Sequence, residues 1–96
     1  MIDKSLTPGK KLRLYGAEQC SEKELLSIII NNGTKSNSAD EIAEKILDKY
    51  GTVYYLQGKT LAELMEIKGI GPVKATQFAA IYELFRRLIR HIERES

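Results

Sequence analysis

The residues best suited to a chemical role lie between Leu61 and Ala75, where two glycines stand in a Gly-x-Gly arrangement before a proline. Glycine permits positive φ where a helix closes, and it lets the backbone come close to a ligand. Pro72 fits the first turn of a following helix, whose unpaired backbone N–H groups and dipole attract anions. The spacing therefore predicts a phosphate-binding helical hairpin. The candidate binding residues of this hairpin are Lys68, Gly69, Ile70, Gly71, Val73 and Lys74.

Different residues of this hairpin have different expected roles. Ile70 would point inward as a plug that joins the two helices. Because Pro72 lacks an N–H, the phosphate contacts are expected from three other backbone amides: those of Gly71, Val73 and Lys74. Lys35, in the polar loop of residues 31–37, is a further expected contact, although that loop lacks the compact Gly-x-Gly turn. The hairpin could instead serve packing alone, and this second explanation stays open.

The remaining polar residues give no support for catalysis. His91 is the one histidine and Cys20 the one cysteine, so neither a metal cluster nor an internal disulfide can be drawn. Aspartates and glutamates are scattered rather than grouped with a nucleophile or a base. We therefore expect no catalytic residue, no metal site, no required cofactor and no enzymatic activity.

Helix signals flank the hairpin and extend over the whole chain. Ser21, Ser38 and Thr60 each precede a glutamate by three residues, which is the capping-box pattern of a helix start. Thr7 with Pro8 marks a further start, and glycines at positions 16, 33, 51 and 69 mark ends. These signals predict an all-α fold of five helices, or six with a short turn around 53–56. The expected helices span residues 8–15, 21–31, 38–50, 60–67 and 72–93.

Apolar spacing predicts which helix faces are buried. Helix 38–50 has one apolar face, made of Ala39, Ile42, Ala43, Ile46, Leu47 and Tyr50. Helix 60–67 presents Leu61, Leu64 and Ile67. The last helix carries a stripe made of Phe78, Ile81, Phe85, Leu88 and Ile92, with four arginines largely off that stripe, Arg86, Arg87, Arg90 and Arg94. At about 33 Å it is longer than a small core can cover. Its far end should project. The stripe could pack on the core, or its exposed end could pair with another helix. The arginines could be a solvated face or a positive edge.

Length and composition predict a single soluble domain over residues 1–96. The chain is 43% hydrophobic and carries a formal net charge of only +2, so any nucleic-acid binding depends on a local site. No apolar run approaches the roughly 20 residues that span a bilayer, and no signal peptide is recognisable at the start. A cytoplasmic protein without membrane contact is expected.

The hairpin resembles a known DNA-binding motif. The pattern Leu64-x-x-Ile67-x-Gly69-Ile70-Gly71-x-x-Lys74-Ala75 looks like the helix-hairpin-helix motif of many DNA repair and recombination proteins. That resemblance implies binding to the phosphate backbone without reading sequence, sometimes through a bound monovalent cation. Residues 21–50 could be a degenerate first copy of the motif at about 60–90, which would make a pseudo-symmetric pair.

From about Leu6 to Arg87 the chain also resembles the N-terminal domain of the RadC family of bacterial DNA repair proteins. The resemblance rests on three further stretches, Tyr15-Gly16-Ala17-Glu18, Ser21-x-x-Glu24-Leu25-Leu26-x-Ile28 and Gly33-Thr34-Lys35-x-x-Ser38. In that family a domain similar to JAMM-type metalloproteases follows, and its histidine-rich metal site has no counterpart here. The expected function is a sequence-nonspecific DNA-binding module. The alternative is a protein-interaction or regulatory domain that self-associates or docks a partner through its last helix.

Overall fold

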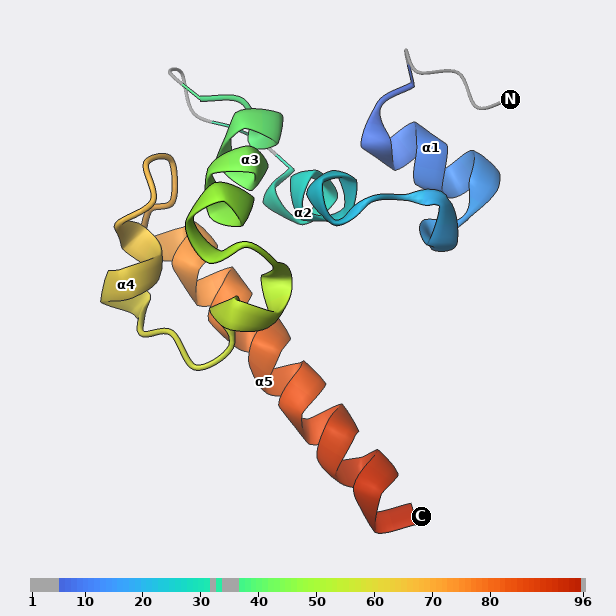
Figure 1. Ribbon diagram of the computed structural model, residues 1–96, viewed down its shortest axis with the longest axis vertical. Coiled ribbons are helices and arrows are strands. Elements are labelled where there is room, and N and C mark those ends of the chain that lie inside the picture. The colour runs from blue at the N-terminus through green and yellow to red at the C-terminus, as the bar shows by residue number, and fades with distance from the viewer. Residues whose placement is uncertain (1–5, 32, 34–36, 96) are drawn as a thin grey trace.

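The chain folds into five α-helices and two short 3₁₀ helices, seen in a computed structural model that describes residues 6–31, 33 and 37–95 (Figure 1). No β-strand occurs among these residues, which confirms the all-α fold class. The elements in chain order are α1 (Pro8–Tyr15), η1 (Ala17–Gln19), α2 (Glu22–Ile30), α3 (Ala39–Tyr50), η2 (Val53–Leu56), α4 (Leu61–Met65) and α5 (Pro72–Glu95).

All three predicted capping boxes form. The Ser21 hydroxyl accepts a hydrogen bond from the Glu24 amide at 3.2 Å, while the Glu24 carboxylate accepts one from the Ser21 amide at 2.9 Å. The same reciprocal pair of bonds starts α3 at Ser38 and α4 at Thr60. These side chains satisfy backbone N–H groups that a helix start leaves unpaired. Local sequence therefore determines where these helices begin.

One short helix was not predicted, and three helix ends differ from the predicted ones; α5, for example, ends at Glu95 rather than at residue 93. The 3₁₀ helix η1 was not predicted, since three residues carry too little periodicity to reveal it. Helix α4 ends at Met65 rather than at residue 67, because the Ile67 amide bonds back only three residues, to the Leu64 carbonyl. Helix α2 is closed by Asn31 at a φ of 61°, two residues before Gly33, and asparagine tolerates positive φ better than other non-glycine residues.

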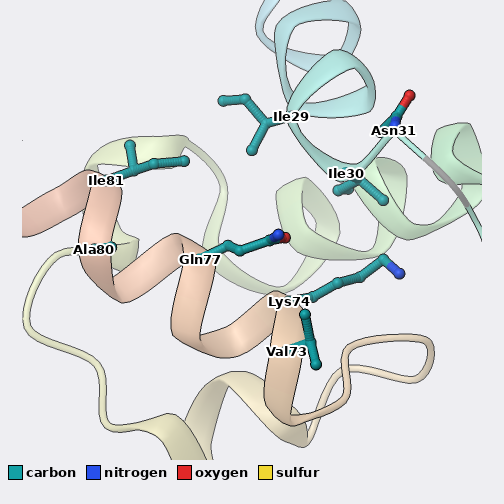
Figure 2. A pocket seen from close by; sticks show the side chains of 8 residues that line it. All are labelled: Ile29, Ile30, Asn31, Val73, Lys74, Gln77, Ala80 and Ile81. Atoms are coloured by element: carbon teal, nitrogen blue, oxygen red, sulfur yellow. The ribbon is translucent and has the colours of Figure 1, made fainter.

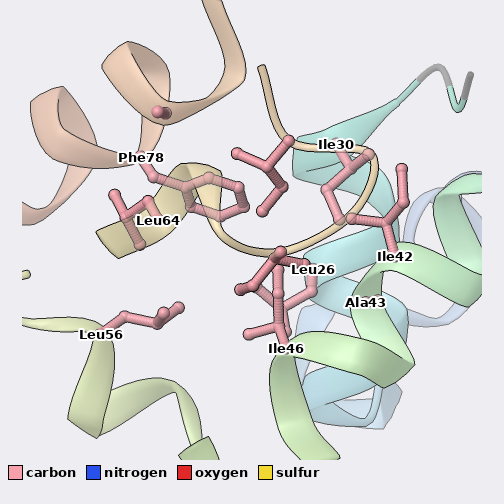
Figure 3. Close-up of a cluster of buried hydrophobic side chains, with 11 residues drawn as sticks. Leu26, Ile30, Ile42, Ala43, Ile46, Leu56, Leu64 and Phe78 are labelled. Atoms are coloured by element: carbon pink, nitrogen blue, oxygen red, sulfur yellow. The ribbon is translucent and has the colours of Figure 1, made fainter. Parts of the chain in front are cut away.

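One core joins the two helical pairs α2–α3 and α4–α5 (Figure 3). Its buried side chains come from every element after η1: Leu26, Ile30, Ile42, Ala43, Ile46, Leu56, Leu64, Ile67, Ile70, Ala75 and Phe78. The predicted apolar face of α3 is confirmed, since the rest of that face packs against this cluster. The prediction for Leu61 was wrong: it remains 46% exposed at the first position of α4, outside the core.

Helix α5 extends well beyond this core, as its long free end in Figure 1 shows. Phe78 is 2% exposed, whereas Phe85 is 50% and Leu88 is 55% exposed. The radius of gyration is 14.5 Å, against about 12.5 Å for a compact chain of this length. The expected projection of the last helix is thus confirmed, and only the start of its apolar stripe belongs to the core.

Two structural features are absent from the described part of the chain. No three potential metal-ligating side chains of histidine, cysteine, aspartate or glutamate come together there. None of the described helices combines the length and the apolar character needed to cross a bilayer.

Candidate nucleic-acid interface

The connection between α4 and α5, residues 66–71, is a tight turn held by its own backbone. The Ile67 amide donates to the Leu64 carbonyl at 3.2 Å, and the Ile70 amide donates to the Ile67 carbonyl at 3.0 Å. Ile70 is 4% exposed, so its predicted role as an inward plug is confirmed. This anchoring fixes the direction in which α5 leaves the turn. We call residues 66–74 the hairpin.

The two glycines of the hairpin meet different surroundings. Gly69 has a φ of 101°, and a Cβ built there would lie 2.7 Å from Cγ1 of Ile42, a fully buried side chain. Gly71 does not have positive φ, and a Cβ built there would meet nothing within 4 Å. Gly69 therefore has the predicted positive φ and packs closely on the core, whereas Gly71 leaves bare backbone facing open space.

The N-terminus of α5 differs from the other helix starts. Helices α1 to α4 begin with side-chain caps from Thr7, Ser21, Ser38 and Thr60. Helix α5 follows Gly71, whose carbonyl accepts from the Ala75 amide at 3.0 Å but which has no side chain to cap the amides. No acidic residue occupies its first turn. The amides of Gly71, Val73 and Lys74 have no acceptor among the described residues, so the positive end of this dipole faces outward.

Two lysines add positive charge to this end of α5. Lys68 is exposed and Lys74 is half-buried, and neither pairs with a carboxylate of the described residues. The nearby carboxylate of Glu66 lies 3.9 Å from the Lys49 ammonium, which offsets its charge. The hairpin therefore presents free amides and two cations, an arrangement suited to a phosphate group.

An open groove of about 620 Å³ lies beside the hairpin, between the end of α2 and the start of α5 (Figure 2). Val73 and Lys74 form its hairpin end, and Lys74 extends toward the α2 side in Figure 2. Asn31 and Gln77 bring two further polar groups, and isoleucines and an alanine line the rest. Sequence reasoning missed Asn31 and Gln77, because packing between segments more than 40 residues apart brings them to the site.

The first helical pair meets the hairpin, but its described residues form no comparable anion site. The Ser38 and Glu41 side chains already occupy the N-terminus of α3, and Asp40 adds a second acid there. Lys45 bonds to the Asn37 side-chain oxygen, and a Cβ built on Gly69 would lie 3.7 Å from Cβ of Asn37. A lysine of α3 thus supports the loop next to the hairpin, which the sequence did not predict. Lys35, the remaining predicted contact, lies outside the described residues.

The arginines of α5 are remote from the hairpin. Hydrogen bonds from Arg86 at 3.0 Å and Arg87 at 2.9 Å lower the pKa of Glu83 to about 2. The hydrogen bond to Glu83, and then the charge of Glu83, raise the pKa of Arg86. Arg86 is about 18 Å along the helix from Lys74. Arg86 and Arg87 therefore bind Glu83, and their distance from Lys74 keeps them away from the hairpin.

Fold and site together define a small all-α domain of paired helices with an open, cation-flanked helix N-terminus. The family model described as UPF0758 N-terminal matches residues 2–76, so the chain belongs to the UPF0758 family. A UPF0758 protein of Streptococcus sanguinis is 41% identical over 88 residues, which cover 92% of this chain and 39% of that protein. A UPF0758 protein of Bacillus cereus is 39% identical, with 93% and 40% covered.

The chain thus spans about two-fifths of the length of the curated relatives it matches. UPF0758 proteins are a RadC-like family, so the family expected from the sequence is confirmed for this N-terminal domain. No solved structure matches the chain.

Proposed function

We propose that this domain binds duplex DNA without sequence preference, through the phosphate backbone, and that it carries no catalysis of its own. The observation that carries the proposal is the start of α5, which is uncapped, free of acids and preceded by the bare backbone of Gly71. The amides of Val73 and Lys74 and the Lys68 ammonium complete the phosphate contact. The resemblance to RadC proteins supports a place in DNA repair.

The chemistry of the hairpin favours backbone contact over base reading. Amides and lysines recognise phosphate oxygens, which carry no sequence information. The hairpin supplies no set of side chains able to make paired hydrogen bonds to base edges. Contacts to ~2 to 4 phosphates would give a log–log salt slope of about −2 to −4 and a Kd of roughly 10⁻⁴ to 10⁻⁶ M.

The test is fluorescence anisotropy of a labelled duplex at several salt concentrations, with variants of the hairpin. Gly71→Asp should remove binding while keeping the fold, because aspartate caps the helix amides and repels phosphate. Lys74→Gln should weaken binding and reduce the salt slope by about 1. Lys10→Gln, an exposed lysine on α1, makes the same change of charge away from the site and should leave the slope unchanged.

Two results would contradict this function. One is a Gly71→Asp variant that folds and still binds DNA with the original salt slope. The other is an equal loss of affinity in Lys74→Gln and Lys10→Gln, which would mean that only the net charge of the domain matters. A labelled branched DNA in the same series would show whether duplex or junction geometry is preferred.

A protein-interaction function is the alternative, and the exposed apolar side chains of α5 favour it. The low net charge of +2 also fits a domain that has little attraction for DNA at long range. Absence of DNA binding at low salt, together with association through α5, would support this alternative.

A further inference from the structure

The projecting half of α5 exposes a continuous apolar strip. Leu84 is 64%, Phe85 50%, Leu88 55% and Ile89 53% exposed, and Ile92, at 56%, continues the strip toward the end of the helix. Monomeric proteins rarely leave so many large apolar side chains together in water. We call these five residues the α5 seam.

The spacing of the seam is that of a helix that pairs with another helix. Ile81, Phe85, Leu88 and Ile92 follow one another at intervals of four, three and four residues, which is the heptad rhythm of a coiled coil. Leu84 and Ile89 flank this line on either side and widen it. From Ile81 to Ile92 the line is about 17 Å long. It is long enough for a helix of similar length to lie along it.

The base of the seam opens into an apolar cavity of about 150 Å³ between α2 and α5. Leu25, Ile29, Ile81 and Phe85 belong to its wall, so Phe85 lies in both the cavity and the seam. Glu22 is the one charged residue of the lining. Its carboxylate accepts from the Thr52 hydroxyl at 3.2 Å, and no lysine or arginine of the described residues pairs with it. The cavity therefore suits a partner with apolar side chains and a nearby cation.

We propose that a second copy of this chain covers the seam, with the two α5 helices antiparallel. The far end of α5 carries both the apolar side chains and the cations that would match this cavity: isoleucines at 89 and 92, and arginines at 90 and 94. An antiparallel pair places the far end of each helix on the cavity of the other copy, so both cavities are filled by one symmetric contact. A parallel pair would leave both cavities empty and bring the two domain bodies to the same end.

The size of the seam determines how tightly the two copies should associate. A strip about 17 Å long and about 10 Å wide buries far less than the ~800 Å² per partner of a standard interface. The dimer should therefore be weak, with a Kd in the micromolar range or above, and its association should depend on concentration. This proposal does not require DNA binding by the hairpin.

Sedimentation velocity of the whole chain at concentrations up to about 1 mM tests the association. Leu88→Glu should raise the dimer Kd at least ~100-fold, because each new carboxylate would be placed against Phe85 of the other copy, inside an apolar contact. Leu14→Glu is the matched control: Leu14 is 65% exposed on α1, outside the seam, and its replacement should leave association unchanged. A chain that remains monomeric throughout, or equal effects of the two variants, would overturn the proposal.

Cysteine cross-linking in a Cys20→Ser background tests the orientation. Ile81→Cys together with Ile92→Cys should form disulfide-linked dimers, since these positions face each other in an antiparallel pair centred between Phe85 and Leu88. Ile92→Cys alone should not, because its counterpart would lie about 16 Å away along the helix. Efficient cross-linking by Ile92→Cys alone would show a parallel pair and reject the proposed arrangement.

Discussion

At the scale of single residues, the hairpin shows that two glycines two positions apart can serve unrelated purposes. Gly69 combines positive φ with close packing on Ile42, so it is part of the fold. Gly71 has neither restriction, and the space in front of its backbone is open to a ligand. In the proposed function, Gly69 would therefore determine stability and Gly71 would determine phosphate binding. Substitutions at the two glycines should separate them experimentally.

Gly69→Ala should lower the free energy of unfolding by at least about 1–2 kcal/mol, because alanine disfavours positive φ and its methyl group would strike Ile42. Gly71→Ala should lower it by a few tenths to about 1 kcal/mol, through the poorer helix start alone. Urea unfolding followed by circular dichroism measures both. Equal losses in the two variants would show that the packing of Gly69 against Ile42 is not restrictive.

At the scale of elements, helix starts were predictable because their signals are local. Each capping box is contained within four residues, and all three form as predicted. Positions that depend on distant packing were not predictable in this way. The exposure of Leu61, the approach of Lys45 to the hairpin through Asn37, and the groove position of Gln77 all depend on how α3 and α5 meet the rest of the core.

The capping boxes predict an acid-sensitive fold. Hydrogen bonds from Thr60 lower the pKa of Glu63, and the Ser21 amide and Lys11 lower that of Glu24, both below the ordinary value of 4.5. A carboxyl with a lower pKa in the folded chain stabilises it above the unfolded pKa, and this stability is lost as pH falls through the folded pKa. Glu63→Gln keeps the hydrogen-bond acceptor but cannot be protonated. In urea unfolding, its free energy of unfolding should therefore fall less steeply below pH 4.5 than that of the unchanged chain. An unchanged acid dependence would exclude this contribution.

Tyr82 predicts the opposite dependence at alkaline pH. Its hydroxyl donates to the Val53 carbonyl at 2.7 Å and ties η2 to α5. Burial, and then the charge of Glu22, raises the Tyr82 pKa from 10.0 to about 12. A pKa raised by folding gives stability that is present below pH 10 and lost as pH rises toward 12. Tyr82→Phe should cost about 0.5–1.5 kcal/mol at neutral pH. It should also weaken the alkaline loss, measured by urea unfolding from neutral to alkaline pH.

At the scale of the whole molecule, the domain consists of a body that ends near Tyr82 and a helix that continues beyond it. Helical periodicity predicted a long helix over residues 72–93 and its projection, since a rod of that length exceeds the core that a chain of this size can build. The observed helix has 24 residues. Periodicity does not reveal what the projecting half of α5 contacts. An apolar stripe that packs within the chain and one that packs on a partner have the same spacing in the sequence.

A chain ending at Arg87 separates the body from the projection. It keeps Phe85 at the apolar cavity and the hydrogen bonds between Glu83 and both arginines, and it loses Leu88, Ile89 and Ile92. Because none of the removed residues belongs to the core, its free energy of unfolding at low concentration should change by no more than about 0.5 kcal/mol. Its self-association should disappear in sedimentation velocity, whereas the salt slope for DNA should remain. A chain ending at Ala80 is the control, and without Tyr82 it should have a lower free energy of unfolding. If the chain ending at Arg87 already showed a large loss of this free energy, residues 88–96 would stabilise the body.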